Sequence, residues 1–402
     1  MRRLLIVLSL ALFACGHPVE KVKRRVADAF DVGVPLGRPD DFRARQKERF
    51  DQAWRELQSF RAQQALQRQQ QAAAAQPPQP IQFVTGVKES FKNLDATAIN
   101  VAPVNVPITG EGKGPSVLKA QVYLDRAHFS VSSIDGEWGK NSAIAVWWWQ
   151  RSHGTEPTGE VDEATFRSIA AAAGYAPALV EYRVSEADTQ GPFVHIPDSV
   201  YEQQKLSCLC YQSVREELAE RFHVSEDFLK ELNPDVKFSD LQPGNAIIVP
   251  NVRPPITVDQ QDIARVVISI VGNSWNGFDA SGNLIFHAPT TLGSTYDPSP
   301  DETLHVIKII DHPHFHYDPT LYHEVPDDMP DAHLSPGPNS PVGVVWIALS
   351  KEHYGIHGTK DPDSIGYTSS HGCVRLTNWD AAEVQHRISV SVPVAFVDTR
   401  RR

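Results

Sequence analysis

The residues best suited to chemistry stand close together near the end of the sequence. A cysteine thiol is mostly protonated at neutral pH, so a nucleophilic cysteine needs a nearby imidazole to accept its proton. His371 lies two residues from Cys373, whereas His357 comes from another segment and can approach the sulfur freely. Gly372 permits a tight turn in which backbone N–H groups face a developing oxyanion. The two runs are Gly355-Ile356-His357-Gly358-Thr359 and Ser369-Ser370-His371-Gly372-Cys373-Val374-Arg375.

A mostly-β domain is predicted to position these residues. From about residue 258 the apolar pattern changes from helical to strand-like, with runs rich in Val and Ile bounded by Gly, Pro, Asp and Asn. Turns are expected at Asn276-Gly277 and at Ser281-Gly282-Asn283. Only Asp380–Arg387 has a clear helical pattern. The predicted strands lie within 263–271, 304–310, 342–349 and 390–397.

A helical region is predicted between Ser116 and Ala176. Two glycine turns, Asp135-Gly136-Glu137-Trp138-Gly139 and Thr158-Gly159, separate its helices, because glycine adopts positive φ without strain. Asn141 or Ser142 is expected to cap the second helix. The run Trp147-Trp148-Trp149 is expected to lie mostly in the core, with one ring exposed for sugar stacking. The three stretches with helical spacing begin near residues 117, 142 and 162.

Strand and helix signals are mixed between residues 179 and 252. An insertion, residues 188–207, separates the first strand from the first helix. Cys208 and Cys210 are expected to be small buried apolar side chains, because a disulfide between positions i and i+2 of a strand would close a strained ring. A redox or metal pair is the functional alternative. The predicted order is strand, helix, helix, strand, at residues 181–184, 214–232 and 246–250.

The two histidine-containing runs resemble the signature of the L,D-transpeptidase family with the YkuD-type catalytic domain, since 14 positions separate His357 from His371. The stretch from Pro338 to Trp346 resembles that family's Pro-x-Gly strand. By this resemblance Cys373 would be the nucleophile and His357 the general base, oriented by the Gly358 carbonyl. His371 and Gly372 would shape the active-site turn and the oxyanion hole.

The same resemblance assigns three residues to substrate binding. Arg375 would hold a carboxylate through its planar guanidinium, Ser370 would hydrogen-bond within the turn and Tyr354 would line the cleft. A purely structural role is the alternative for each of them.

The reaction implied is two-step acyl transfer on peptidoglycan stem tetrapeptides, without a metal or an organic cofactor. Cys373 would form a thioester with the third stem residue and release D-Ala, and carbapenems would acylate the same sulfur. An amine of another stem would then give a 3-to-3 crosslink, and a protein lysine would attach a protein to the wall. Water as the acceptor would make the enzyme an L,D-carboxypeptidase.

Two upstream regions resemble wall-binding modules, a three-helix peptidoglycan-binding domain and an α+β LysM-like module that binds glycan strands. The predicted fold class is therefore multidomain, with a mostly-β YkuD-like catalytic domain after these two modules. The predicted boundaries are 1–15 for a lipoprotein signal peptide, 16–112 for a helical, Gln/Pro-rich tether and linker, 113–178 for the peptidoglycan-binding-like domain, 179–252 for the LysM-like module and 253–402 for the catalytic domain.

The first residues predict export. Two arginines precede an apolar run from Leu4 to Phe13 that is too short to span a bilayer, and the run ends before Cys15 as in a bacterial lipoprotein. We expect lipid attachment at Cys15 and a periplasmic location at the outer membrane, with the lipid as the sole membrane contact. With 38 Lys and Arg against 49 Asp and Glu, the net charge of −11 argues against nucleic acid as a partner.

Two rival functions follow from other features. The alternate histidines His312, His314 and His316 could hold a metal on one face of a strand, as in a zinc peptidoglycan hydrolase, but Pro313 weakens that strand and Cys373 would have no role. Solvent-exposed loop histidines are the simpler interpretation, and no metal site is predicted. A non-catalytic wall anchor is the second rival.

Overall fold

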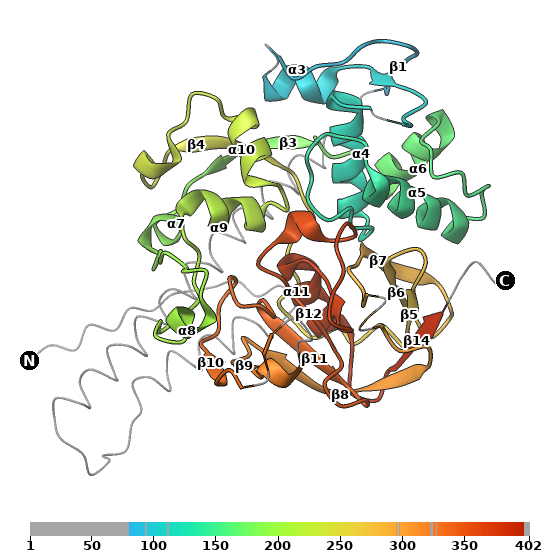
Figure 1. Cartoon of the computed structure of the whole chain (residues 1–402). Helices are drawn as coiled ribbons and strands as arrows, with labels where there is room; N and C mark the ends of the chain where they lie inside the picture. Colours follow the sequence, from blue (N-terminus) through green and yellow to red (C-terminus); the bar gives the residue numbers. More distant parts are fainter. Residues whose placement is uncertain are drawn as a thin grey trace, which may run out of the picture. The chain divides into compact units, whose positions relative to one another are not determined.

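The computed structural model describes residues 80–397, apart from residues 93, 94, 111, 295, 297, 322–324 and 327 (Figure 1). The predicted signal peptide, Cys15 and most of the predicted tether lie outside the described residues. Among the residues described, no helix is both long enough and apolar enough to cross a membrane.

The predicted helical region forms three helices. Asp162 caps the third one by accepting a hydrogen bond from the Thr165 N–H at 2.7 Å. The expected cap of the second helix is wrong: that helix follows Gly139, while Asn141 donates to the Ile365 carbonyl and Ser142 accepts from Gln121. Trp148 and Trp149 are buried, and Trp147 is half-buried. The helices are α4 (Pro115–Arg126), α5 (Lys140–Ser152) and α6 (Glu163–Ala172).

Residues before the three helices are also folded. Two short parallel strands pair through Phe83 and Val104, and Ile99 of the intervening helix is buried with the helical core. These elements lie in the last part of the stretch predicted as a linker. They are β1 (Phe83–Val84), α3 (Ala96–Val101) and β2 (Val104–Asn105).

The next region has the predicted order of strand, two helices and strand. Its two strands pair antiparallel, with Leu179 opposite Pro250. This order matches the expectation for a LysM-like module, although that identity stays a prediction. The insertion contributes two short helices between the first strand and the first main helix. The elements are β3 (Leu179–Arg183), α7 (Glu186–Gln190), α8 (Val200–Gln203), α9 (Val214–Arg221), α10 (Glu226–Leu232), η1 (Phe238–Asp240) and β4 (Ala246–Pro250).

Cys208 and Cys210 form a disulfide, so the expectation of two separate thiols is wrong. The prediction assumed the geometry of a regular strand. The segment is irregular instead, and its Cα atoms are 5.2 Å apart, within the range that a disulfide spans.

The catalytic region contains one eight-stranded sheet, in the order β13-β12-β11-β8-β14-β5-β6-β7. The four predicted strand runs are confirmed, but Asn276 and Gly277 lie inside β6 rather than in a turn. Gly277 is needed there for packing, because a Cβ atom would come within 2.7 Å of Ile263. The strands are β5 (Arg265–Ser269), β6 (Ser274–Phe278), β7 (Leu284–Pro289), β8 (Thr303–Asp311), β11 (Val345–Leu349), β12 (Gly355–His357), β13 (Val374–Arg375) and β14 (Pro393–Val397).

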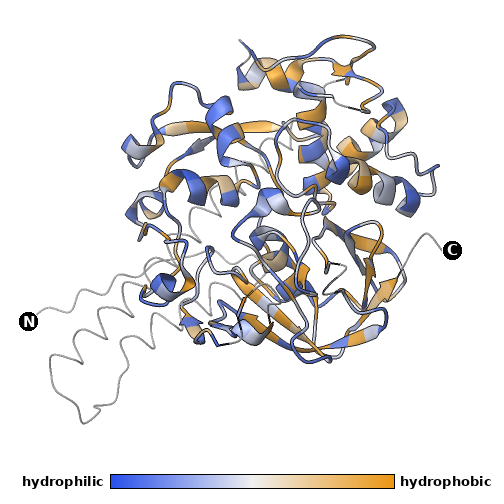
Figure 2. Ribbon diagram, viewed as in Figure 1, coloured by the Kyte–Doolittle hydropathy of each residue, from blue (hydrophilic) through white to orange (hydrophobic). Residues whose placement is uncertain are grey.

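Helix α11 (Asn378–Arg387) packs against this sheet and confirms the predicted helix near residue 380. Its Ala381 and Val384 share a buried apolar cluster with Trp275 and Phe286 of the strands. Figure 2 shows the apolar residues concentrated along the strands. Burial of a Val or Phe side chain contributes about 1.5–3 kcal/mol to the free energy of unfolding, so the cluster stabilises the sheet that carries the site.

A separate two-stranded hairpin, residues 315–334, extends from the catalytic region. It consists of β9 (Phe315–Tyr317) and β10 (Ala332–Leu334). Leu209, which lies between the disulfide-bonded Cys208 and Cys210, is fully buried against Ala332 and Leu334. The Leu209 N–H donates to the Pro336 carbonyl at 3.0 Å, and the Leu209 carbonyl accepts from the Asn339 N–H at 2.9 Å. The disulfide segment therefore braces the base of the β9–β10 hairpin.

Arg253 joins the helical and catalytic regions. Its guanidinium, only 2% exposed, pairs with Asp125 of α4 and with Asp380 and Glu383 of α11. The Arg253 N–H also donates to Asp125 at 2.9 Å. We call these four residues the Arg253 junction.

Candidate active site

Strand pairing places the two predicted catalytic residues on neighbouring chain segments. His357 ends β12, and Cys373 immediately precedes β13, which pairs parallel with β12 through His357 and Arg375. Gly372 has φ +105°, a conformation that side chains rarely adopt, and a Cβ there would come within 3.0 Å of Tyr354. The turn before Cys373 therefore requires glycine.

A cavity of about 500 Å³ opens beside Cys373. The structure brings together six predicted site residues around this cavity. Gly358 directly follows one of them, His357, and Gly372 lies between two others, His371 and Cys373. Because their roles depend on a substrate, those roles stay predictions. The six are Tyr354, His357, Ser370, His371, Cys373 and Arg375.

The His357 ring is held in one tautomer. Its Nδ1 lies 2.6 Å from the Gly358 carbonyl, which can only accept, so Nδ1 carries the hydrogen and Nε2 of the neutral ring can accept a proton. The ring is 4% exposed and stacks on Trp346, with centroids 5.5 Å apart. Burial lowers the pKa of His357 to about 4, and the Arg375 cation acts in the same direction, against the Gly358 hydrogen bond.

The Cys373 thiol is also held in its neutral form. Burial raises the pKa of Cys373, against the opposing effects of the Gly355 backbone and the Arg375 cation. Its Sγ donates to the His353 carbonyl, 3.4 Å away. At neutral pH the site is therefore a thiol with a neutral imidazole, and nucleophilic attack requires transfer of the thiol proton to a base.

Hydrogen bonds hold the turn around Cys373. The Ser370 hydroxyl donates to the Cys373 carbonyl at 2.6 Å, and the Ser299 hydroxyl donates to the Gly372 carbonyl at 3.1 Å. Arg375 is anchored by its backbone N–H, which donates to the Thr291 carbonyl at 2.9 Å. The backbone around Cys373 is thus preorganised.

Sequence reasoning missed one wall of the cavity. His314 and His316 of the hairpin segment line it, together with Asp318, His353 and Trp346. The alternating histidines of this segment could have indicated that it lines the cavity, but from the sequence they were considered only as metal ligands or as solvent-exposed loop residues.

The histidine pattern does not form a metal centre in the described residues. His312 pairs with Asp311 at 2.9 Å, and His316 pairs with Asp331 at 3.0 Å. Within those residues no group of three or more His, Cys, Asp or Glu side chains could hold a metal ion.

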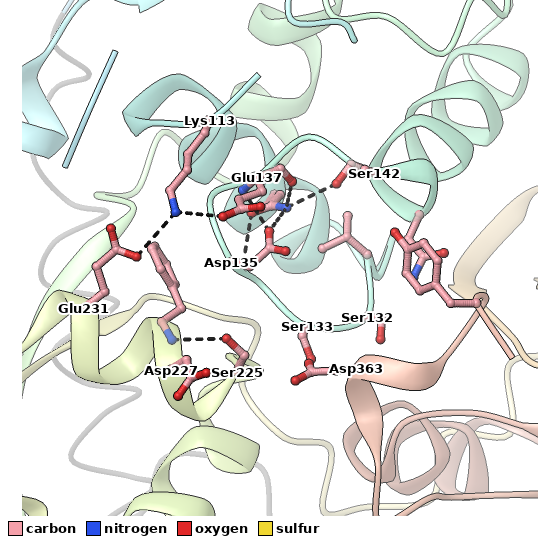
Figure 3. Close-up of a pocket in the computed structure, with 16 residues that line it drawn as sticks. Lys113, Ser132, Ser133, Asp135, Glu137, Ser142, Ser225, Asp227, Glu231 and Asp363 are labelled. Atoms are coloured by element: carbon pink, nitrogen blue, oxygen red, sulfur yellow. Dashed lines mark hydrogen bonds and ion pairs between the residues drawn. The ribbon is translucent and has the colours of Figure 1, made fainter. Parts of the chain in front are cut away.

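A second cavity, of about 400 Å³, lies between the helical, LysM-like and catalytic regions. Figure 3 shows carboxylates of all three regions around it, with Lys113 bonded to Glu137 at 2.7 Å and near Glu231 at 3.6 Å. Asp227 and Asp363 line the opposite side. Neither Cys373 nor His357 lines this cavity, so the predicted catalytic residues belong to the first one.

Comparison with known proteins assigns two parts of the chain. Residues 265–395 match the YkuD family, described as "L,D-transpeptidase catalytic domain", and residues 113–169 match a family described as "Putative peptidoglycan binding domain". Proteins named "Putative L,D-transpeptidase YkuD" from Bacillus licheniformis and Bacillus subtilis are 27% and 26% identical. Both alignments cover 42% of this chain, and they cover 84% and 83% of the relatives.

Among solved structures, L,D-transpeptidase 3 from Mycobacterium tuberculosis is 15% identical with a TM-score of 0.29, covering 40% of this chain and 77% of that one. This likeness is too distant to bear on the site. The family matches and the relatives confirm the predicted resemblance to L,D-transpeptidases, without extending it to the LysM-like module. The chain thus carries an L,D-transpeptidase catalytic domain of the YkuD family, preceded by a peptidoglycan-binding domain.

Proposed function

We propose that the protein is an L,D-transpeptidase that acts on peptidoglycan stem tetrapeptides through a thioester on Cys373. One observation carries this proposal: Cys373 and His357 line the same cavity, and the Gly358 carbonyl holds the His357 ring with Nε2 as the proton acceptor. A protonated thiol with a neutral imidazole is the starting state of a nucleophile activated by a general base.

In the first step Nε2 of His357 accepts the thiol proton as Cys373 Sγ attacks the carbonyl carbon of the third stem residue. The C–S bond forms, and backbone N–H groups of the Gly372 turn stabilise the oxyanion. The bond to D-Ala then breaks, and His357 returns the proton to the leaving amine. Arg375, on the cavity wall, binds a substrate carboxylate.

In the second step an acceptor takes the acyl group. A stem amine gives a 3-to-3 crosslink, and a protein lysine attaches a protein to the wall. Water gives a tripeptide, the reaction of an L,D-carboxypeptidase. The peptidoglycan-binding domain would hold the chain on the wall that supplies both substrates.

Mass spectrometry of products from purified disaccharide-tetrapeptide tests this proposal. We expect a dimer that has lost one D-Ala, and no dimer with Cys373→Ala. Binding of both proteins to purified sacculi controls for folding. Tripeptide alone would favour the carboxypeptidase, whereas sacculus binding without any product would favour the non-catalytic anchor.

The same sulfur is the proposed target of carbapenems. Incubation with a carbapenem should add one drug mass to the wild-type protein and none to Cys373→Ala. Labelling of the variant would place the reactive group elsewhere.

We further propose that the protein is a periplasmic lipoprotein anchored through Cys15, on the basis of its apolar leader and the cysteine that follows it. Membrane fractionation of cells that express the wild type or Cys15→Ala tests this. The wild type should sediment with outer membranes and the variant should not. Equal fractionation would contradict the anchor.

A further inference from the structure

Side chains of opposite charge line the active-site cavity. Arg375, beside Cys373, contributes a cation, and Asp318 contributes the sole carboxylate among the described residues that line the cavity. Asp318 directly follows β9 and precedes the short helix η2 (Pro319–Leu321). The two charges thus come from different segments, the sheet edge and the hairpin.

The Asp318 carboxylate is fixed in place. The Thr320 N–H donates to Oδ1 at 3.0 Å, and the Thr320 hydroxyl donates to the same atom at 2.7 Å. These bonds hold the pKa of Asp318 below its usual range, with a smaller contribution from His316 and His353, so the group is ionised at neutral pH. Both hydrogen bonds end on Oδ1, which leaves Oδ2 able to accept from a ligand.

The fold holds Asp318 at the cavity from both sides. The preceding residue, Tyr317, pairs with Ala332 in the hairpin, and the following residue, Pro319, is buried. Leu209 packs under Ala332, so the braced hairpin supports this wall. A carboxylate positioned in this way can select a ligand by charge.

We propose that Asp318 binds the ammonium group of the acyl acceptor and thereby favours amines over water at the thioester. This inference rests on the proposed L,D-transpeptidase function and deepens it. Arg375 would receive the carboxylate of the donor stem, whereas Asp318 would receive the positive charge of the acceptor. The opposite charges would give the two substrates different binding positions in one cavity.

The transfer step balances without a further reactant. The bound ammonium first loses one proton to water. The neutral amine then attacks the thioester carbonyl carbon, so that the C–N bond forms as the C–S bond to Cys373 breaks. His357 accepts the second amine proton at Nε2 and passes it to the departing sulfur. Asp318 takes no part in these bonds and acts by concentrating and orienting the acceptor.

Partition of the thioester between two nucleophiles and water tests the proposal. The protein is mixed with disaccharide-tetrapeptide and either Nα-acetyl-lysine amide, which carries an ammonium group, or hydroxylamine, which is uncharged at neutral pH. For Asp318→Asn we expect the ratio of lysine adduct to tripeptide to fall about fivefold, while the hydroxylamine ratio is unchanged. The ratio of lysine adduct to tripeptide should also decrease with added salt for the wild type, and it should not change for Asp318→Asn.

Asp328→Asn is the matched control, because Asp328 is exposed in the same loop and does not line the cavity. In Asp328→Asn the thioester should partition between each nucleophile and water as it does in the wild type. D-Ala released in a single turnover, before the acceptor reacts, reports separately whether Asp318→Asn is folded and forms the thioester.

Two results would overturn the inference while leaving the proposed function intact. One is a ratio of lysine adduct to tripeptide that is unchanged in Asp318→Asn. The other is an equal decrease of the adduct-to-tripeptide ratio with lysine and with hydroxylamine. A wild-type protein that releases no D-Ala would instead overturn the proposed function, and the inference with it.

Discussion

Arg253 and His357 are both almost completely buried, yet one is held as a cation and the other is held neutral. At the Arg253 junction three carboxylates overcome the desolvation that would lower the pKa of Arg253. In return Arg253, His128 and Arg387 keep the pKa of Glu383 well below its usual range despite the desolvation of that carboxyl. At the active site burial acts with the Arg375 cation, and His357 has a carbonyl rather than a carboxylate as its partner. The hydrogen-bonding partner therefore decides which form is present after burial: carboxylates keep a buried guanidinium charged, and a carbonyl leaves a buried imidazole neutral.

His357→Gln should have the largest effect, because it removes the base and leaves the thiol protonated. We expect release of D-Ala from tetrapeptide to slow by about 10²–10⁴-fold. His305→Gln is the control, since His305 is exposed on β8 and does not line the cavity. Single-turnover product analysis measures both, and a loss below tenfold in the first variant would identify another base.

Arg253→Met should have the next largest effect, on stability. It leaves three carboxylates without their common cation, and breaking such a buried pair costs about 3–5 kcal/mol. Urea unfolding compares it with Arg265→Met, where an exposed guanidinium lies over Phe278. Equal stabilities of the two variants would mean that the junction contributes little.

Arg375→Gln should change the pH dependence of acylation. The pKa of His357 is lowered to about 4, so the neutral base is present above that pH and is lost below it. Removing the nearby cation should raise this pKa, and the acidic limb of the rate profile should move upward toward the ordinary histidine value of about 6.5. Carbapenem acylation at a series of pH values measures the shift. An unmoved limb would show that burial alone sets the pKa.

Replacing both Cys208 and Cys210 by serine should have the smallest effect. The disulfide closes a loop of very few residues, so the chain-entropy model gives a loss of about 1–2 kcal/mol. Hydrogen exchange should become faster in β9 and β10 and stay unchanged in β5 and β6. Equal exchange throughout would contradict the proposed brace of the hairpin.

The sequence was most informative where chemistry requires adjacent residues. Cys373, Gly372 and His371 are contiguous, and β11, which pairs with the strand that carries His357, lies in a predicted apolar run, so the motif and part of its sheet could be predicted. The three-residue strand β12 was not among the predicted strands. The wall formed by Asp318 could not, because it depends on where the hairpin packs rather than on local pattern.

The wrong predictions have a common physical cause. Gly277 and Cys208 were interpreted from local rules for turns and strands, while their positions are set by tertiary packing. The side chain of Asn141 was likewise expected to serve its own helix, yet it bonds to Ile365 in the catalytic region. Tertiary contacts overrode local preference in each case.

The burial of Leu209 beneath the hairpin also limits how the chain can be divided. A fragment that begins after residue 253 would leave Ala332 and Leu334 without the side chain that covers them. Such a fragment would expose an apolar surface, and the wall that carries Asp318 would lose its support. We therefore expect residue 209 and the two β10 positions to be exchanged together when pieces of related chains are recombined, so that a working chimera inherits the disulfide segment and the hairpin as one unit.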